Sequence, residues 1–182
     1  MISKDKAARD RRVLVMARTS KDAATTQALL AQVGIEAETC QGLDQLAREL
    51  RSGAAAMVIP EEGLSPAAMA TLSGILAEQP AWSDLPVLVL TRPGADSVEL
   101  GEALRMLGNV TVLECPLRVP TLLSAVRTAI RARDRQYQIR GHLAERLKNE
   151  QALRSADRRK DEFLATLAVS YTHLTLPTIL LV

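Results

Sequence analysis

The feature that most constrains the fold is a regular alternation of two residue periods between Arg12 and Arg133. Short apolar, β-branched runs, typical of strands buried on both faces, alternate with longer segments of helical periodicity. The expected strands span residues 12–17, 35–40, 54–59, 85–91 and 110–114. The expected helices span residues 20–34, 42–53, 65–79 and 96–108, and a fifth begins at Pro120. This alternation predicts an α/β domain with a five-stranded parallel sheet.

Signals at the helix ends support these boundaries. Ser20 and Ser65 are expected N-caps, with Pro66 at the first helical position, and Gly34 and Gly108 are expected to end their helices. Crossovers between parallel strands are right-handed, which favours a flavodoxin-like doubly wound sheet with strand order 2-1-3-4-5. Such folds bind ligands at the carboxyl ends of their strands, so the residues that directly follow each strand are the candidate functional positions.

Composition argues against several classes of function. The 182 residues carry a formal charge of +2 and only 2% aromatic residues, so we expect no nucleic-acid partner, which usually requires a basic face with stacking aromatics. Cys40 and Cys115 are too few and too far apart for a zinc site or a disulfide framework. Residues 1–12 lack a signal peptide's apolar run, and residues 13–17 are too short to span a membrane. We therefore expect a cytoplasmic protein with reduced thiols, no metal ion and no membrane partner.

A charged helical segment follows the α/β domain. Residues 131–168 contain no proline and alternate in charge sign. Apolar residues recur there at helical spacings, at Leu143, Leu147, Leu153, Ala156, Leu164 and Leu167. A helix without a core of its own needs a partner, so we expect residues 134–168 to form a parallel two-stranded coiled coil in a homodimer. Arg146 and Glu150 interrupt the heptad and Gly141 weakens the helix, which leaves a single helix folded back on its own domain as the alternative.

The element order of residues 12–133 resembles the receiver domain of two-component signalling, which accepts a phosphoryl group on an aspartate. That chemistry needs an acidic pair after the first strand to hold Mg²⁺, and an aspartate after the third strand as the nucleophile. The family also uses a Thr or Ser after the fourth strand and a Lys-Pro pair after the fifth. The resemblance implies a receiver-like domain over residues 11–133, preceded by a flexible tail at residues 1–10.

This chain departs from the family pattern after the first and third strands. Ala17 and Arg18 stand where the metal-binding carboxylates would be, and a cation there opposes a divalent metal. Pro60, Glu61 and Glu62 follow the third strand, without an aspartate. Glu61 either imitates the charge of a phosphoaspartate or is an ordinary loop carboxylate.

The positions after the last two strands match in part. Thr91 fits the hydroxyl position, whereas Cys115 and Pro116 replace Lys-Pro, with either a cis or a trans bond before the proline. Phosphoryl transfer has neither an acceptor nor charge neutralisation without the missing carboxylates. We therefore expect a non-phosphorylatable pseudo-receiver that binds no cofactor.

The motif RRKDEFLATLA at residues 158–168 resembles the start of the dimerisation and phosphoacceptor helix of sensor histidine kinases. The resemblance assigns residues 134–158 to a signalling helix and residues 159–168 to the start of the phosphoacceptor helix. In that family the motif continues into His-Glu, but here Val169 and Ser170 occupy those positions. The implied full-length parent is a protein histidine kinase that uses ATP and Mg²⁺ and acts on a response regulator. This chain lacks the phosphoacceptor histidine, so we expect it to be inactive and to contain no catalytic residue.

The last fourteen residues, Val169–Val182, have a separate explanation. VSYTHLTLPT matches the translation of the end of a transposase-type sequencing adapter, so we expect the native sequence to continue differently after Ala168. Residues 163–182 are also about long enough for a membrane span, but a histidine, a proline and several threonines weaken their hydropathy. His173 lies several residues too late for the phosphoacceptor and lacks the following acid, and His142 lies in the charged linker, so we assign neither a catalytic role.

Other functions stay open from the sequence. A pseudo-receiver joined to a coiled coil also occurs in RNA-binding antiterminators, and would equally suit a stand-alone dimeric signalling adaptor. The antiterminator interpretation predicts a compact basic helical module after the coil, and none is visible. An enzyme that binds a nucleotide in the α/β crevice would need a glycine-rich loop after the first strand, but residues 17–23 contain no glycine.

Overall fold

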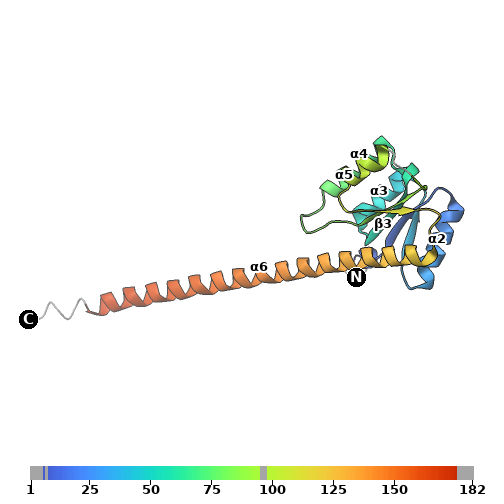
Figure 1. Ribbon diagram of the computed structural model, residues 1–182. Coiled ribbons are helices and arrows are strands. Elements are labelled where there is room, and N and C mark those ends of the chain that lie inside the picture. Colours follow the sequence, from blue (N-terminus) through green and yellow to red (C-terminus); the bar gives the residue numbers. More distant parts are fainter. Residues whose placement is uncertain (1–5, 7, 95–97, 176–182) are drawn as a thin grey trace, which may run out of the picture. The chain divides into compact units, whose positions relative to one another are not determined.

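The computed structural model describes residue 6 and residues 8–94 and 98–175. The chain divides into two units, residues 1–138 and residues 139–182, which are described separately. The first unit holds a five-stranded parallel sheet with the order β2-β1-β3-β4-β5 (Figure 1). This is the flavodoxin-like doubly wound order, so the fold predicted from the sequence is confirmed.

Strands and helices alternate along the chain as the residue periods predict. The strands are β1 (Val13–Met16), β2 (Ala37–Cys40), β3 (Ala56–Pro60), β4 (Val87–Thr91) and β5 (Val110–Glu114). The helices are α2 (Ser20–Gln32), α3 (Leu43–Ser52), the 3-10 helix η1 (Glu61–Gly63), α4 (Pro66–Ala77), α5 (Val98–Met106) and α6 (Val119–Thr175). Each strand lies within its expected range, except that β3 ends one residue later, at Pro60.

The sheet separates two apolar layers, because alternate residues of each strand face opposite sides. Helices α3, α4 and α5 cover one face, while α2 and the first turns of α6 cover the other (Figure 1). In β1, Leu14 and Met16 belong to the first layer, and Val13 and Val15 to the second. Burial on both faces explains why the central strands are apolar throughout. Among the described residues, the α3–α5 layer contains 19 buried apolar side chains and the α2–α6 layer 10.

Hydroxyl side chains cap the helices as expected, with one correction. Ser65 caps α4 with its Oγ 3.3 Å from the Ala68 backbone nitrogen, as predicted. Thr19, and not Ser20, caps α2: its Oγ1 accepts a hydrogen bond from the Asp22 backbone N–H at 3.1 Å. Two adjacent hydroxyls offered the same signal, and the three-residue spacing between Thr19 and the donating N–H of Asp22 decides between them.

A network around Arg12 fastens the start of β1 to β2 and α3. The guanidinium forms ion pairs with Glu38 on β2 and with Glu49 on α3, the latter at 2.7 Å. It also donates to Ser52 Oγ at 2.6 Å and to the Gly53 carbonyl at 3.3 Å. Only 12% of the Arg12 side chain is exposed. One cation therefore satisfies polar groups from two neighbouring elements.

A cation–aromatic cluster holds the portion of α6 that belongs to the first unit. The Cζ atom of Arg133 lies 5.6 Å from the ring centroid of Trp82 and 4.9 Å from that of Tyr137. Its Nη1 donates to Ser83 Oγ at 2.7 Å and to Gln136 Oε1 at 2.8 Å. Arg133 is 5% exposed, which is rare for a charged residue. The cluster joins α6 to the segment between α4 and β4.

In the second unit, α6 continues as one helix to Thr175. The apolar side chains that share the predicted stripe are exposed, with Leu147 at 60% and Leu153 at 67%. No helix within the described part of the chain has both the length and the apolar content needed to cross a membrane. Residues 176–182 of the adapter-like tail lie outside the described residues, and its origin stays a prediction.

Candidate functional site at the carboxyl ends of the strands

A crevice of about 420 Å³ opens at the carboxyl ends of β1, β3, β4 and β5. Its apolar walls are Val15, Met16, Ala17, Pro60, Leu90 and Pro116. Its polar groups are Arg18, Asp22, Thr26, Thr91, Arg92 and Cys115. The crevice lies where the strand order reverses between β1 and β3, which is the place where doubly wound folds bind ligands.

A carboxylate from η1 bridges two arginines of the crevice. Glu62 accepts a hydrogen bond from Arg18 Nε at 2.8 Å and a second from Arg18 Nη2. Arg92 Nη2 lies 2.8 Å from the same Glu62 carboxylate. Arg18 follows β1, Arg92 follows β4 and η1 follows β3, so these ion pairs connect the ends of three strands. The bridge is open to water, because the Arg18 and Arg92 side chains are 46% and 67% exposed.

The bridge keeps Glu62 ionised. Partial burial raises the pKa of the Glu62 carboxyl, but its own backbone N–H and the guanidinium groups of Arg18 and Arg92 outweigh that effect. The pKa of Glu62 therefore lies below its ordinary value. Both arginines thus face a carboxylate over the whole neutral range.

The structure brings together most of the residues singled out from the sequence. Those that line the crevice are Ala17, Arg18, Thr91, Cys115 and Pro116. Glu61 lies in η1 and lines a neighbouring cavity of about 620 Å³ with Pro93. Its role as an imitation of phosphoaspartate stays a prediction, as does the absence of a phosphoacceptor at Val169 in α6.

Sequence reasoning did not single out the bridging role of Glu62. A signal for it was present, because Arg18 and Arg92 directly follow two strands whose carboxyl ends meet at one edge of the sheet. An acidic pair after β3 falls at that same edge. Opposite charges on adjacent strand ends are compatible with an ion-pair network there, although neither charge nor periodicity specifies that Glu62 bridges the two arginines.

The two cysteines occupy contrasting environments. Cys115 is partly exposed beside the crevice, and its backbone N–H donates to the Thr91 carbonyl at 2.8 Å. The peptide bond between Cys115 and Pro116 is cis. Cys40 is buried at the end of β2, where burial, assisted by Glu38 and Glu49, raises the pKa of its thiol to about 11. Both are free thiols.

The crevice does not fit the Mg²⁺ ion that a phosphorylatable receiver would hold. Mg²⁺ requires hard oxygen ligands, but Ala17 offers none and Arg18 presents a cation. Asp22 is the one carboxylate among the lining residues, and it accepts a hydrogen bond from Thr19 Oγ1 at 2.8 Å. Across the described ranges, no group of three or more His, Cys, Asp or Glu side chains could hold a metal ion.

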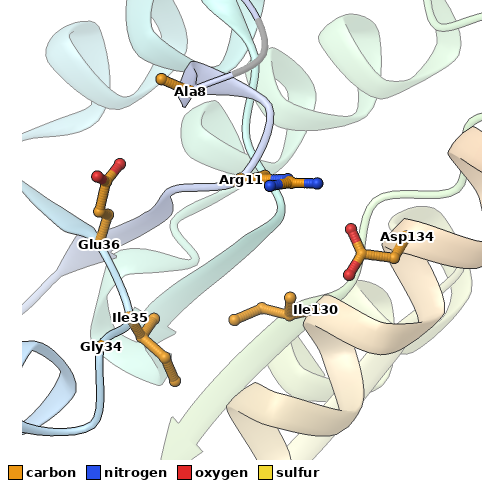
Figure 2. A pocket seen from close by; sticks show the side chains of 7 residues that line it. All are labelled: Ala8, Arg11, Gly34, Ile35, Glu36, Ile130 and Asp134. Carbon is orange, nitrogen blue, oxygen red and sulfur yellow. The ribbon is translucent and has the colours of Figure 1, made fainter.

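A larger cavity of about 660 Å³ lies at the other end of the strands, where β1 and β2 begin. Figure 2 shows Arg11 extending toward the side of the cavity formed by Ile130 and Asp134 of α6, with Ile35 on the segment before β2. This cavity borders the amino ends of β1 and β2, whereas ligand sites of doubly wound folds lie at the carboxyl ends. The carboxyl-end crevice is therefore the candidate functional site.

Comparison with known proteins identifies the fold. No family model and no curated protein matches the chain. A response regulator receiver domain protein from Methanospirillum hungatei matches with a TM-score of 0.57 and 13% identity, covering 69% of this chain and 98% of that one. A response regulator receiver protein from Pseudoalteromonas atlantica matches with a TM-score of 0.52 and 16% identity, covering 65% and 96%. A sensor protein from Polaromonas matches with a TM-score of 0.53 and 21% identity, covering 67% and 97%. The first unit thus has the receiver fold.

Proposed function

We propose that this chain is a receiver-like regulatory module of two-component signalling that does not accept a phosphoryl group. The observation that carries this proposal is the chemistry at the strand ends. Ala17 and Arg18 follow β1, Pro60 ends β3, and an Arg18–Glu62–Arg92 bridge stands beside the crevice. Phosphoryl transfer in this fold would need a nucleophilic carboxylate and charge neutralisation at those positions.

The module belongs, in this proposal, to a cytoplasmic sensor histidine kinase. The support is the motif at residues 158–168, which lies on α6, the same continuous helix that leaves the first unit. A sensor protein also stands among the solved structures with this fold. The full-length parent would use ATP and Mg²⁺ in a further domain and act on a response regulator. The present chain, with Val169 at the phosphoacceptor position, would have no kinase activity.

The helical segment would make the parent a homodimer. Leu143, Leu147 and Leu164 are 48%, 60% and 51% exposed, so their apolar surface is available to a second copy of the helix. Sedimentation of the full chain, compared with a Leu147→Glu/Leu164→Glu variant, tests this directly. We expect a dimer that dissociates in the variant, and a monomeric unsubstituted chain would contradict the pairing.

Acetyl phosphate labelling tests the loss of phosphoryl transfer. The full chain, incubated with acetyl phosphate and Mg²⁺, is expected to show no phosphoryl adduct by intact mass spectrometry. An authentic receiver domain in the same reaction serves as the positive control. An adduct on a carboxylate of the first unit would overturn the proposal.

Sequencing the intact chromosomal locus tests the kinase context and the origin of the tail together. We expect the reading frame to continue from Ala168 into His-Glu and then into an ATP-binding domain. Finding the codons of Val169–Val182 in the intact locus would overturn the adapter explanation, and it would contradict the kinase context because no His-Glu would then follow the motif at residues 158–168.

A further inference from the structure

We propose that the carboxyl-end crevice is a binding site for a small molecule with an apolar body and one anionic group, a carboxylate or a phosphate, which takes the place of the Glu62 carboxylate between Arg18 and Arg92. This inference deepens the proposed function by naming a ligand class for the site at which phosphorylation is absent. It rests on the lining of the crevice, the geometry of the bridge and the position of Asp22.

The walls of the crevice select the body of the ligand. Val15, Pro60, Leu90 and Pro116 present apolar surface from four strand ends. A volume of about 420 Å³ lies within the range of sites that enclose small organic molecules. Apolar walls with a few polar groups at one end are typical of such sites. A bare inorganic anion would leave this apolar surface unused.

The ion pairs of Arg18 and Arg92 with Glu62 indicate which charged group the ligand carries. Arg18 and Arg92 are both directed at one carboxylate, with nitrogen–oxygen separations of 2.8 Å to Glu62 from Arg18 Nε and from Arg92 Nη2. Guanidinium groups bind carboxylates and phosphates in the same forked geometry, so an external anion can make the contacts that Glu62 now makes. Because both arginines are well exposed, their ion pairs with Glu62 contribute little to stability and exchange readily.

Asp22 limits the ligand to a single anionic group. Its carboxylate lines the same crevice from the first turn of α2 and is held by the Thr19 hydroxyl at 2.8 Å. A second negative group near α2 would face Asp22 at close range and be repelled. Thr91 and Thr26 offer neutral hydroxyls on the remaining polar surface.

Exchange of Glu62 for a ligand would remove the Glu62 ion pairs that join η1 to the ends of β1 and β4. The 3-10 helix η1 is followed directly by α4. A bound anion would thereby change the connection between β3 and α4 without any covalent modification.

Titration of the full chain with phenyl phosphate, benzoate and inorganic phosphate tests the proposal. Amide shifts of Ala17, Thr91 and Cys115, followed by heteronuclear NMR, report on the crevice. Phenyl phosphate or benzoate is expected to shift these amides saturably, and inorganic phosphate to bind at least about tenfold more weakly because it lacks an apolar body. The tighter of the two aromatic probes identifies phosphate or carboxylate as the preferred group.

Two substitutions with opposite expected signs separate binding from a general loss of structure. Glu62→Ala removes the internal competitor and should tighten binding several-fold, whereas Arg92→Gln removes a ligand and should weaken it several-fold. Ala17→Leu should block the crevice, because Ala17 lines it. Arg105→Gln is the control and should leave binding unaffected, because Arg105 lies on α5, where its Nε donates to the Gly101 carbonyl.

The absence of saturable shifts even in Glu62→Ala would overturn this inference, as would a change of the same sign in Glu62→Ala and Arg92→Gln. Either result would leave the proposed function standing. An acetyl phosphate adduct would overturn the proposed function without altering these binding measurements.

Discussion

Strand β1 is flanked by two arginines, and the two ends of the strand use them in different ways. Arg12, just before β1, pairs with Glu38 and Glu49 and has 12% of its side chain exposed. Arg18, two residues after β1, pairs with Glu62 and has 46% exposed. The same pairing of residue types thus appears in two environments within one short segment.

The comparison shows that burial, more than the identity of the partners, separates a structural ion pair from one that can exchange. A poorly hydrated guanidinium whose partners are removed leaves a costly unpaired charge, so the Arg12 network is fixed. Water competes with every contact of Arg18, so its pairs can open without disturbing the core. The edge of the sheet with the exposed arginine is also the edge that carries the crevice.

The largest expected effect comes from replacing the buried arginine. Arg12→Leu should lower the free energy of unfolding by about 2–3 kcal/mol, because Glu38, Glu49 and the Gly53 carbonyl lose their shared donor. The matched Arg18→Leu variant should lower it by only about 0.5 kcal/mol. Urea unfolding followed by Trp82 fluorescence measures both, and equal losses would break the comparison.

Arg133 tests the same rule at a third position. It is buried between Trp82 and Tyr137, so Arg133→Met should lower the free energy of unfolding by about 1–2 kcal/mol, as the lost hydrogen bonds to Ser83 and Gln136 outweigh the relief of a buried charge. A shift of the Trp82 emission in the folded variant should accompany the loss. Arg131→Met, an exposed position two residues earlier, is the control and should be nearly silent.

A smaller effect is expected from acid. The hydrogen bond from Arg12 lowers the pKa of the Glu49 carboxyl below its ordinary value near 4.5. A lowered folded-state pKa stabilises the protein at pH values above the unfolded-state pKa, and this contribution disappears as the pH falls through the folded-state pKa. Stability measured from pH 7 downward should therefore decline below about pH 4.5.

Glu49→Gln should flatten this acid decline more than Glu62→Gln does, since the Arg12 contact is less exposed than the Arg18 contact. Chemical unfolding at a series of pH values supplies the slopes. A wild-type stability that rises toward acid would contradict the assignment.

The smallest effect concerns reactivity without a change in stability. Cys40 is buried near the Arg12 network with a thiol pKa raised to about 11 by burial, while Cys115 is partly exposed at the crevice. Iodoacetamide at pH 8 should modify Cys115 in the folded protein and reach Cys40 only after urea is added, because a buried neutral thiol is a poor nucleophile. Peptide mass spectrometry distinguishes the two sites, and prompt labelling of Cys40 would show that the carboxyl end of β2 opens.

Residue periods were sufficient to predict the fold, because each strand of a parallel sheet is a short apolar run between helices, and β4 at Val87–Thr91 is a clear example. The strand ends also followed, since parallel topology brings Ala17, Thr91 and Pro116 to one edge. The partners of Arg12, Glu62 and Arg133 could not be predicted in the same way. These contacts depend on side-chain reach between elements distant in sequence, and periodicity contains no information about that reach.

The two apolar layers of the sheet are unequal, and this has a consequence for how the molecule opens. The layer that α6 shares with α2 contains the fewer buried side chains, and α6 contributes to it through Leu122, Val126 and Ala129. Partial unfolding is easiest where the least apolar surface is lost, so the amides of α2 and of the start of α6 should exchange with solvent before those of α3 and α4. Helix α6 therefore begins in the apolar layer of the first unit that is more loosely anchored.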